Sequence, residues 1–133
     1  MKAYDDENYP HSELSGQIIA VAKTVNDHFR PGLDEKMYER AICIEFAEQG
    51  IFFEVQKSYP VHYKNKYLGV LIPDLIVRET VIVDLKVVDD FHDDHIAQML
   101  GYMSITNLEI GLIINFKHAK LQVKRIANLK KNQ

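Results

Sequence analysis

Three charged residues stand in a stretch that otherwise has the composition of two buried β-strands. In LIPDLIVRETVIVDLKV (residues 71–87), Asp74, Asp84 and Lys86 are surrounded by apolar and mostly branched side chains. Charged residues are depleted in strands, and aspartate is among the rarest there. Two carboxylates can bind a hard divalent cation, and a neighbouring lysine can stabilise charge that develops on a phosphate. The pattern therefore suggests a metal-assisted reaction at a phosphate.

The spacing of the three residues gives a geometric prediction. The turn-forming residues lie around Arg-Glu-Thr (78–80), so we place the centre of a hairpin at Glu79. In that register Asp74 faces Asp84, at a Cβ separation of about 4.5–5.5 Å, where two anions repel each other unless Mg²⁺ lies between them. Because side chains alternate along a strand, one face carries Ile82, Asp84 and Lys86, and the other carries Val81, Val83, Leu85 and Val87.

A less specific interpretation is also open for these residues. Asp84 and Lys86 could form a solvated ion pair on an exposed face, with Asp74 in a turn after Pro73. The P-D…D-x-K pattern is short, and most occurrences of so short a pattern would have this explanation. However, the strands are strongly apolar on both faces, as in a covered sheet, and charges buried in such a sheet need partners.

Length and composition indicate the class of protein. The chain has 133 residues, of which 47% are hydrophobic, enough for one compact domain with a core. The formal net charge of −3 does not support a globally basic nucleic-acid binder but leaves room for a local basic patch. Cys43 has no disulfide partner and is expected to be a small apolar core residue in a reducing compartment. Without a signal-like or membrane-length apolar segment, we expect a cytoplasmic protein with no membrane partner.

The pattern along the chain predicts one α/β domain. Residues 1–11 are expected to form a flexible acidic N-terminal arm, and residues 12–133 a single domain. Helices are predicted over 12–29, 33–49 and 93–106, strands over 52–63, 67–77, 80–88 and 109–116, a turn at 64–66, and a strand or short helix over 120–129. This order predicts a central mixed β-sheet, an antiparallel meander plus a return strand, flanked by helices.

Several short motifs, taken in order, resemble the PD-(D/E)XK nuclease superfamily and, within it, the GxxExxY family. PD at 73–74 and DLK at 84–86 resemble the acid and lysine motifs that name the superfamily. GLDEKMY (32–38) has the GxxExxY spacing, and HIAQMLGYM (95–103) resembles the helix after the lysine strand. GLIINF (111–116) resembles the next strand. The resemblance covers roughly residues 14–127 and implies a restriction-endonuclease-like core.

The resemblance also implies roles for individual residues. It implies that Asp74 and Asp84 bind the metal, with the carbonyl of Leu85 as a further ligand, and that Lys86 is the catalytic lysine. Glu35 resembles the upstream helical acid that completes the metal site. Gln98 and Tyr102 resemble an active-site-facing pair, and their i, i+4 spacing puts them on one helix face with His95 one turn earlier. The implied cofactor is Mg²⁺ or Mn²⁺.

Several of these positions also have plain structural explanations. Glu35 could serve only as a favourable charge at a helix N-terminus. His95 could be either a satisfied interior histidine or a contact to phosphate. Four aspartates lie around the start of the third helix, and we expect their negative charges to stabilise the helix N-terminus. Binding of a second metal ion is the alternative. These residues are Asp89, Asp90, Asp93 and Asp94.

A basic C-terminal segment offers candidate contacts to phosphate. Its cations are Lys117, Lys120, Lys124, Arg125, Lys130 and Lys131. We expect Lys124 and Arg125, together with His95, to contact nucleic acid, although a solvated tail is an equally good explanation of the cluster.

The expected function is that of a metal-dependent phosphodiesterase that hydrolyses a nucleic-acid backbone, with DNA as the expected substrate. The alternative is a non-catalytic nucleic-acid-binding or assembly module that keeps the fold. A small-molecule metallohydrolase is a further rival, which would need a closed pocket beside Asp84. Because no recognition domain accompanies the core, a homodimer or a protein partner could supply specificity.

Overall fold

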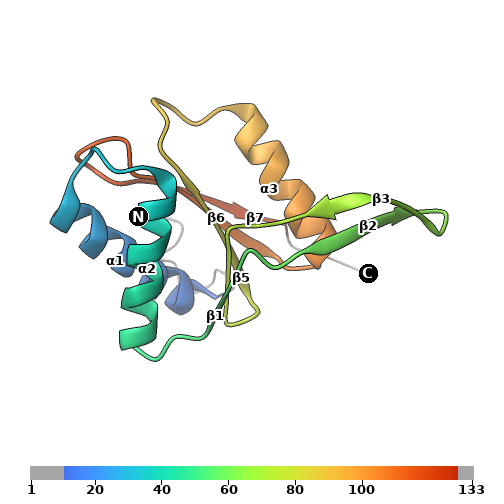
Figure 1. Ribbon diagram of the computed structural model, residues 1–133, viewed down its shortest axis with the longest axis horizontal. Helices are drawn as coiled ribbons and strands as arrows, with labels where there is room; N and C mark the ends of the chain where they lie inside the picture. The colour runs from blue at the N-terminus through green and yellow to red at the C-terminus, as the bar shows by residue number, and fades with distance from the viewer. Residues whose placement is uncertain (1–10, 129–133) are drawn as a thin grey trace.

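The computed structural model describes residues 11–128, and the predicted acidic arm lies almost wholly outside them, as do Lys130 and Lys131. Its elements, in chain order, are α1 (Ser12–Phe29), α2 (Glu35–Glu48), β1 (Phe53–Val55), β2 (Tyr59–Tyr63), β3 (Lys66–Leu71), β4 (Leu75–Val77), β5 (Val81–Lys86), α3 (Asp93–Thr106), β6 (Ile110–Asn115) and β7 (Gln122–Ala127). Figure 1 shows a central sheet with helices on its two faces and a two-stranded arm, β2–β3, that projects from one side.

The central sheet is mixed, as the sequence predicts. Its strand order is β1-β4-β5-β6-β7. The pairs β1/β4, β4/β5 and β6/β7 are antiparallel, and β5/β6 is parallel. A parallel pair needs a crossover connection, which here is α3. The α/β fold with an antiparallel meander and a return strand is therefore confirmed.

The three predicted helices are present. Each begins and ends within two residues of its predicted bounds. Asp34 caps α2, since its Oδ1 accepts a hydrogen bond of 2.9 Å from the Met37 amide. No helix within residues 11–128 is long and apolar enough to cross a membrane.

Two predicted strands are each divided in the structure. The segment 52–63 breaks at Gln56, whose φ of 54° is incompatible with a continuous strand, and so separates β1 from β2. The segment 67–77 breaks around Pro73, between β3 and β4. The inner halves join the central sheet and the outer halves form the arm, a separation that the sequence analysis did not predict. The segment 120–129, left open as strand or helix, contains strand β7.

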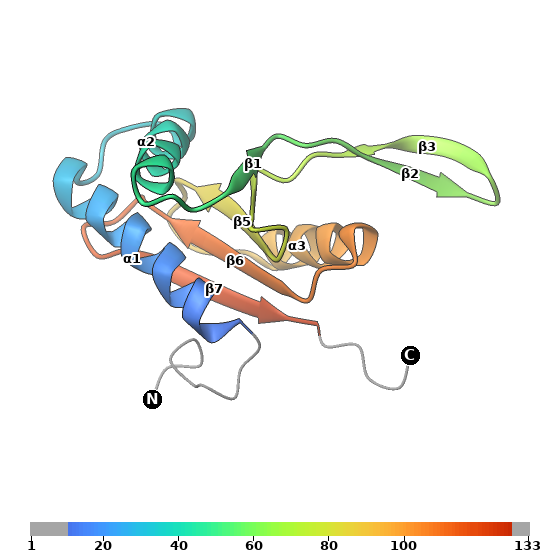
Figure 2. The ribbon, with the colours of Figure 1, turned by 90° about the horizontal axis from the view of Figure 1, so that it is seen from below.

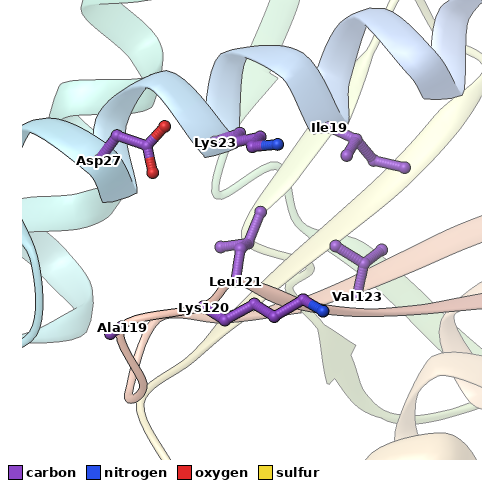
Figure 3. Close-up of a pocket in the computed structure, with 7 residues that line it drawn as sticks. All are labelled: Ile19, Lys23, Asp27, Ala119, Lys120, Leu121 and Val123. Carbon is purple, nitrogen blue, oxygen red and sulfur yellow. The ribbon is translucent and has the colours of Figure 1, made fainter.

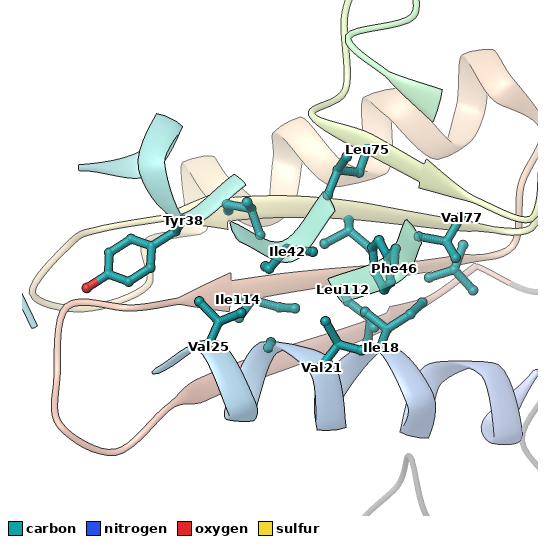
Figure 4. Close-up of a cluster of buried hydrophobic side chains, with 14 of the residues drawn as sticks. Ile18, Val21, Val25, Tyr38, Ile42, Phe46, Leu75, Val77, Leu112 and Ile114 are labelled. Carbon is teal, nitrogen blue, oxygen red and sulfur yellow. The ribbon is translucent and has the colours of Figure 1, made fainter. Parts of the chain in front are cut away.

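The face of the sheet beneath α1 and α2 holds the larger apolar cluster. Figure 4 shows the side chains of both helices meeting those of β4 and β6. The labelled residues are Ile18, Val21, Val25, Tyr38, Ile42, Phe46, Leu75, Val77, Leu112 and Ile114. Tyr38 also stacks on Phe116, with ring centroids 4.4 Å apart, and donates a hydrogen bond to the Arg30 carbonyl. Cys43 packs at the edge of this cluster, where burial and then Glu39 raise the pKa of its thiol to about 11.

The opposite face is covered by one helix, α3 (Figure 2), and Tyr59 and Leu71 from the base of the arm pack at its edge. Its smaller cluster contains Ile76, Ile82, Met99, Tyr102, Met103, Ile113 and Ile126. Gly111 of β6 allows this close approach, because a Cβ at that position would overlap the Met99 side chain. The β5 residues that face α3 change from apolar Ile82 to charged Asp84 and Lys86 towards the end of the strand. The charged residues singled out in the sequence therefore lie where this apolar cluster ends.

Candidate active site

The predicted hairpin register is confirmed. Leu75 pairs with Val83, Ile76 with Ile82, and Val77 with Val81, so the hairpin is centred on Glu79. Asp74 and Asp84 each lie one residue beyond the last pair, at the same end of the hairpin. The predicted division of faces also holds, because Ile82 belongs to the cluster under α3 while Val81, Val83 and Leu85 belong to the cluster under α1 and α2.

Asp84 and Lys86 form a largely buried ion pair. Asp84 is 3% exposed, and its Oδ2 lies 3.0 Å from the Lys86 Nζ. The same ammonium donates a hydrogen bond of 3.2 Å to the Gln98 Oε1 on α3. The ammonium of Lys86 is therefore held between a strand carboxylate and a helix amide.

Tyr102 extends this network one helical turn along α3. Its hydroxyl lies near the Gln98 side chain. Burial, and then the negative charges of Asp84 and Asp74, raise the pKa of Tyr102 to about 12, although Gln98 acts to lower it, so the hydroxyl stays protonated at neutral pH. The predicted pair Gln98 and Tyr102 thus lies beside Lys86.

Asp74 carries negative charge that the protein does not fully balance. Its Oδ2 accepts a hydrogen bond of 2.8 Å from the Leu85 amide. Burial, and then the charge of Asp84, nevertheless raise the pKa of Asp74 to about 6. The two carboxyl groups are close enough to share a hydrogen bond when Asp74 is protonated. Lys86 balances only part of the charge of the aspartate pair.

The main chain of Leu85 faces the side of β5 on which Asp74 lies. In a strand, the N–H and C=O of one residue point to the same neighbouring strand, and those of the next residue point to the other. The Lys86 carbonyl accepts from the Phe116 amide, beside β6, whereas the Leu85 amide donates to Asp74. The Leu85 carbonyl is therefore directed to the Asp74 side, away from β6.

A second helical acid, Glu39, was missed by the sequence analysis. Glu39 is buried, and its Oε2 accepts a hydrogen bond of 3.2 Å from the Gln56 Nε2, which also lies 3.5 Å from the Asp74 Oδ1. Its Oε1 lies 3.2 Å from the Lys36 Nζ. Glu39 follows Glu35 by four residues, so the i, i+4 spacing of two acids on one helix face was the signal available in the sequence.

Glu35 itself lies at the rim of the site. It is exposed in the first turn of α2 and lines a cavity of about 50 Å³. That cavity is lined by Glu35, Lys36, Glu39, Asp74 and Leu85. Two glutamates of α2 thus line the cavity beside Asp74, and the buried one, Glu39, connects to Asp74 through Gln56.

Asn115 is another residue that the sequence analysis missed. It is fully buried on β6, in the row next to Lys86. Its Oδ1 accepts from the amides of Val88 and Lys117, and its Nδ2 donates to the Val88 carbonyl and the Gln122 Oε1. Asn115 therefore fixes the backbone two residues beyond Lys86. A lone amide in the apolar strand GLIINF was the signal for it.

His95 caps its own helix. Its Nδ1 accepts a hydrogen bond of 3.1 Å from the His92 amide, which requires the Nε2 to carry the proton when the ring is neutral. Burial, followed by the charges of Lys86 and His92, lowers the pKa of His95. The neutral ring leaves a single donor, Nε2–H, for any further contact.

Lys124 and Arg125 do not form one basic patch. On β7, Lys124 pairs with Ile113 of β6, and Ile113 in turn pairs with Asp84 of β5. Lys124 is therefore on the α3 face, two strands or roughly 10 Å from Asp84. Arg125 lies opposite Leu112 and therefore points to the face covered by α1 and α2. The two side chains thus point to opposite faces of the sheet, and their expected contact with nucleic acid stays a prediction.

A larger cavity of about 570 Å³ lies away from the acids, between α1 and the start of β7 (Figure 3). Lys23 and Asp27 project into it from α1, facing Lys120 and Leu121. None of the residues predicted to bind metal or to act in catalysis lines this cavity.

The donor set suits a hard divalent cation. The aspartate pair and the Leu85 carbonyl offer only oxygen atoms, and Mg²⁺ is commonly bound by one or two carboxylates, with water and phosphate completing its shell. No group of three or more His, Cys, Asp or Glu side chains among residues 11–128 is arranged to hold a metal ion. Such an ion would therefore depend on the two aspartates, the main chain and the substrate.

Comparison with known proteins decides the family. The family model of the PD-(D/E)XK nuclease superfamily matches residues 12–126. The chain belongs to this superfamily. Pro73–Asp74 and Asp84–Leu85–Lys86 spell the motif in the superfamily's name. Membership implies a nuclease that hydrolyses phosphodiester bonds in nucleic acid. Assignment to the GxxExxY family stays a prediction.

Two solved structures have similar folds. The crystal structure of SSO0001 aligns with a TM-score of 0.51 and 12% identity, covering 86% of this chain and 67% of that chain. An alkaline exonuclease (LHK-Exo) from Laribacter hongkongensis aligns with a TM-score of 0.48 and 12% identity, covering 81% of this chain and 76% of that chain. The first similarity supports the fold. The search of curated proteins found no match.

Proposed function

We propose that the chain is a divalent-metal-dependent nuclease that cleaves the DNA backbone. The observation that carries the proposal is the convergence of Asp74, Asp84 and Lys86 at one end of the β4–β5 hairpin, with the Lys86 ammonium held by Asp84 and Gln98. Purely passive binding of a polyanion gains nothing from two carboxylates placed where a phosphate must approach. The acid pair is therefore better explained by metal-assisted hydrolysis than by a binding module.

The metal would be held by Asp74, Asp84 and the Leu85 carbonyl, with Glu35 and Glu39 as nearby acids on α2. A bound Mg²⁺ or Mn²⁺ would supply Lewis acidity at the scissile phosphate and lower the pKa of the attacking water. The raised pKa of Asp74 fits this role, since it reports negative charge that a cation would balance. We infer that Glu39, through Gln56, keeps Asp74 oriented.

Lys86 supplies positive charge where negative charge increases on the phosphate oxygens. Its ammonium is fixed before substrate binds, because Asp84 accepts from one side and Gln98 from the other. We infer that the nearby Tyr102 hydroxyl helps to orient the Gln98 amide. A charge that needs no rearrangement during the reaction stabilises the transition state more than the ground state.

The size of the cavity argues against the small-molecule metallohydrolase. The cavity beside Asp74 measures about 50 Å³, whereas sites for small organic ligands typically measure about 300–1,000 Å³. A polymer that lies across the open end of the hairpin needs only a phosphate to reach the acids.

A cleavage assay tests the proposal. Single-stranded, duplex and branched DNA, and matched RNA, are incubated with Mg²⁺ or Mn²⁺ and with EDTA. We expect metal-dependent cleavage of DNA, and in Lys86→Ala a loss of turnover of about 10²-fold or more, the scale seen when a preorganised electrostatic group is removed. Lys23→Ala is the matched control, because Lys23 is exposed on α1, on the other side of the sheet, and should leave turnover unchanged.

Two outcomes would refute the proposal. Cleavage by Lys86→Ala at the wild-type rate would remove Lys86 from the reaction. Titration calorimetry with Asp84→Asn gives an independent check, and an unchanged Mg²⁺ affinity would refute the assignment of Asp84 as a ligand.

A further inference from the structure

The β2–β3 arm is connected directly to the candidate active site. Its strands form a separate two-stranded antiparallel sheet that extends away from the body (Figures 1 and 2). At its base the backbone N–H of Gln56 donates a hydrogen bond of 3.0 Å to the backbone carbonyl of Asp74, and β3 leads through Pro73 into Asp74. Six residues of strand reach about 20 Å. A polymer lying on the arm would therefore continue into the acids.

The arm is positively charged in a chain that is negative overall. Residues 56–72 contain Lys57, Lys64 and Lys66 but no aspartate or glutamate, whereas the whole chain has a formal charge of −3. Lys57 is paired with Glu54 at the base, at 3.3 Å. Neither Lys64 nor Lys66, at the tip, forms an ion pair with any other described residue. The tip thus offers two cations to a polyanion.

Aromatic and aliphatic side chains on the same arm are left in solvent. Tyr63 and Tyr67 are each 63% exposed, and Leu68 is 66% exposed. At the base, by contrast, Tyr59 and Leu71 pack against the cluster under α3. The cross-strand register puts Tyr67 opposite His62, with ring centroids 5.8 Å apart. Tyr63 lies opposite Lys66 in the next pair, so it points to the other face of the arm and each face carries an exposed ring.

Exposed rings beside lysines that have no carboxylate partner match the chemistry of unpaired nucleotides, and the Lys64 ammonium already lies 5.4 Å from the centroid of the Tyr63 ring. Aromatic side chains stack on the faces of exposed bases, and ammonium groups contact the phosphates between them. A second copy of this chain fits less well, because the lysines of one arm would meet those of the other. Addition of a peptide strand at the free edges is also disfavoured by edge lysines.

We propose that the β2–β3 arm binds the unpaired part of the nucleic-acid strand that enters the active site. A strand that wraps around the narrow arm stacks bases on Tyr67 at one face and on Tyr63 at the other, and Lys64 and Lys66 at the tip contact its phosphates. This inference rests on the proposed function and adds a substrate preference to it, for single strands or single-stranded extensions over blunt duplex.

Binding measurements in EDTA test the arm separately from catalysis. The full chain is titrated into a fluorescent single-stranded oligonucleotide and, separately, into the blunt duplex of the same sequence. Tyr63→Ala/Tyr67→Ala should weaken single-strand binding about tenfold or more, since each stacked base contributes substantially, and should change duplex binding much less. Tyr63→Phe/Tyr67→Phe keeps both rings and should retain single-strand affinity.

A salt series and a matched control complete the test. Lys64→Gln/Lys66→Gln should reduce the slope of log affinity against log salt by about 0.7 for each phosphate that no longer meets a lysine. Phe52→Ala removes an exposed ring outside the arm and should leave the affinity and the slope unchanged. Circular dichroism of each variant checks that the fold persists.

The outcomes separate this inference from the proposed function. If the wild-type chain cleaves DNA but the Ala and Gln variants of the arm bind single strands as tightly as it does, the arm assignment is wrong and the nuclease assignment stands. If the wild-type chain neither binds nor cleaves any of the substrates, both are wrong. If sedimentation shows that Tyr63→Ala/Tyr67→Ala dissociates a dimer without changing oligonucleotide affinity, the arm is a self-association surface instead.

Discussion

The two faces of the central sheet differ in how completely helices cover them. On the face under α1 and α2, the inward residues of β5 are apolar along the whole strand, from Val81 through Val83 to Leu85. On the face under α3, the same strand changes from Ile82 to Asp84 and Lys86. Because side chains alternate along β5, this one strand contributes both to a closed core and to the candidate active site. Only the face under α3 opens to solvent beside the charged residues.

The largest effect on stability is expected on the closed face. Phe46→Ala should lower the free energy of unfolding by about 3–5 kcal/mol, because it leaves a cavity beneath α2 that neighbouring side chains fill only partly. Ile44→Ala is the control on the same helix, since Ile44 is 59% exposed, and should cost about 0.5 kcal/mol or less. Urea unfolding measures both, and equal losses would contradict the assignment of this face as the main core.

A smaller effect is expected where the strand ends beside Lys86. Asn115→Leu removes the partners of the Val88 amide and carbonyl, and should cost on the order of 2 kcal/mol, the scale of buried groups left without hydrogen bonds. Gln122→Leu removes only one of the bonds to Asn115 and should cost less. Urea unfolding gives the loss, and turnover should fall as well in Asn115→Leu. Full stability in Asn115→Leu would show that Asn115 does not fix this backbone.

The smallest effect concerns the charge on the open face and depends on pH. The pKa of Asp74 is raised from its ordinary 3.8 to about 6, so the folded state holds this proton more tightly than the unfolded state. Ionised Asp74 therefore destabilises the metal-free fold above about pH 6, and this cost disappears as the pH falls from 6 towards 4. Asp74→Asn, which keeps an acceptor for the Leu85 amide, should be more stable than the wild type at pH 7.5 in EDTA, by on the order of 1 kcal/mol.

Thermal unfolding across pH 4–8 in EDTA checks this sign. The gain in Asp74→Asn should vanish near pH 4, where Asp74 is protonated in the wild type, and Mg²⁺ should stabilise the wild type but not the variant at pH 7.5. Asp27→Asn, an exposed substitution on α1, is the control. A variant less stable than the wild type at pH 7.5 would show that the aspartate pair is not in net repulsion.

The sequence by itself determined the helices, the hairpin register and the convergence of Asp74, Asp84 and Lys86. These features depend on periodicity and on a turn only a few residues away, so their geometry is fixed once the hairpin forms. The order of short motifs added the superfamily, because no single motif among them is specific.

Only the tertiary structure decided which distant residues complete the site. The link from Glu39 through Gln56 to Asp74 joins α2 to the base of the arm, and Asn115 joins β6 to the segment after β5. The division of two predicted strands into sheet and arm, and the opposite directions of Lys124 and Arg125, likewise follow from strand pairing. Such contacts depend on which elements become neighbours when the apolar faces are buried, and local periodicity does not specify those neighbours.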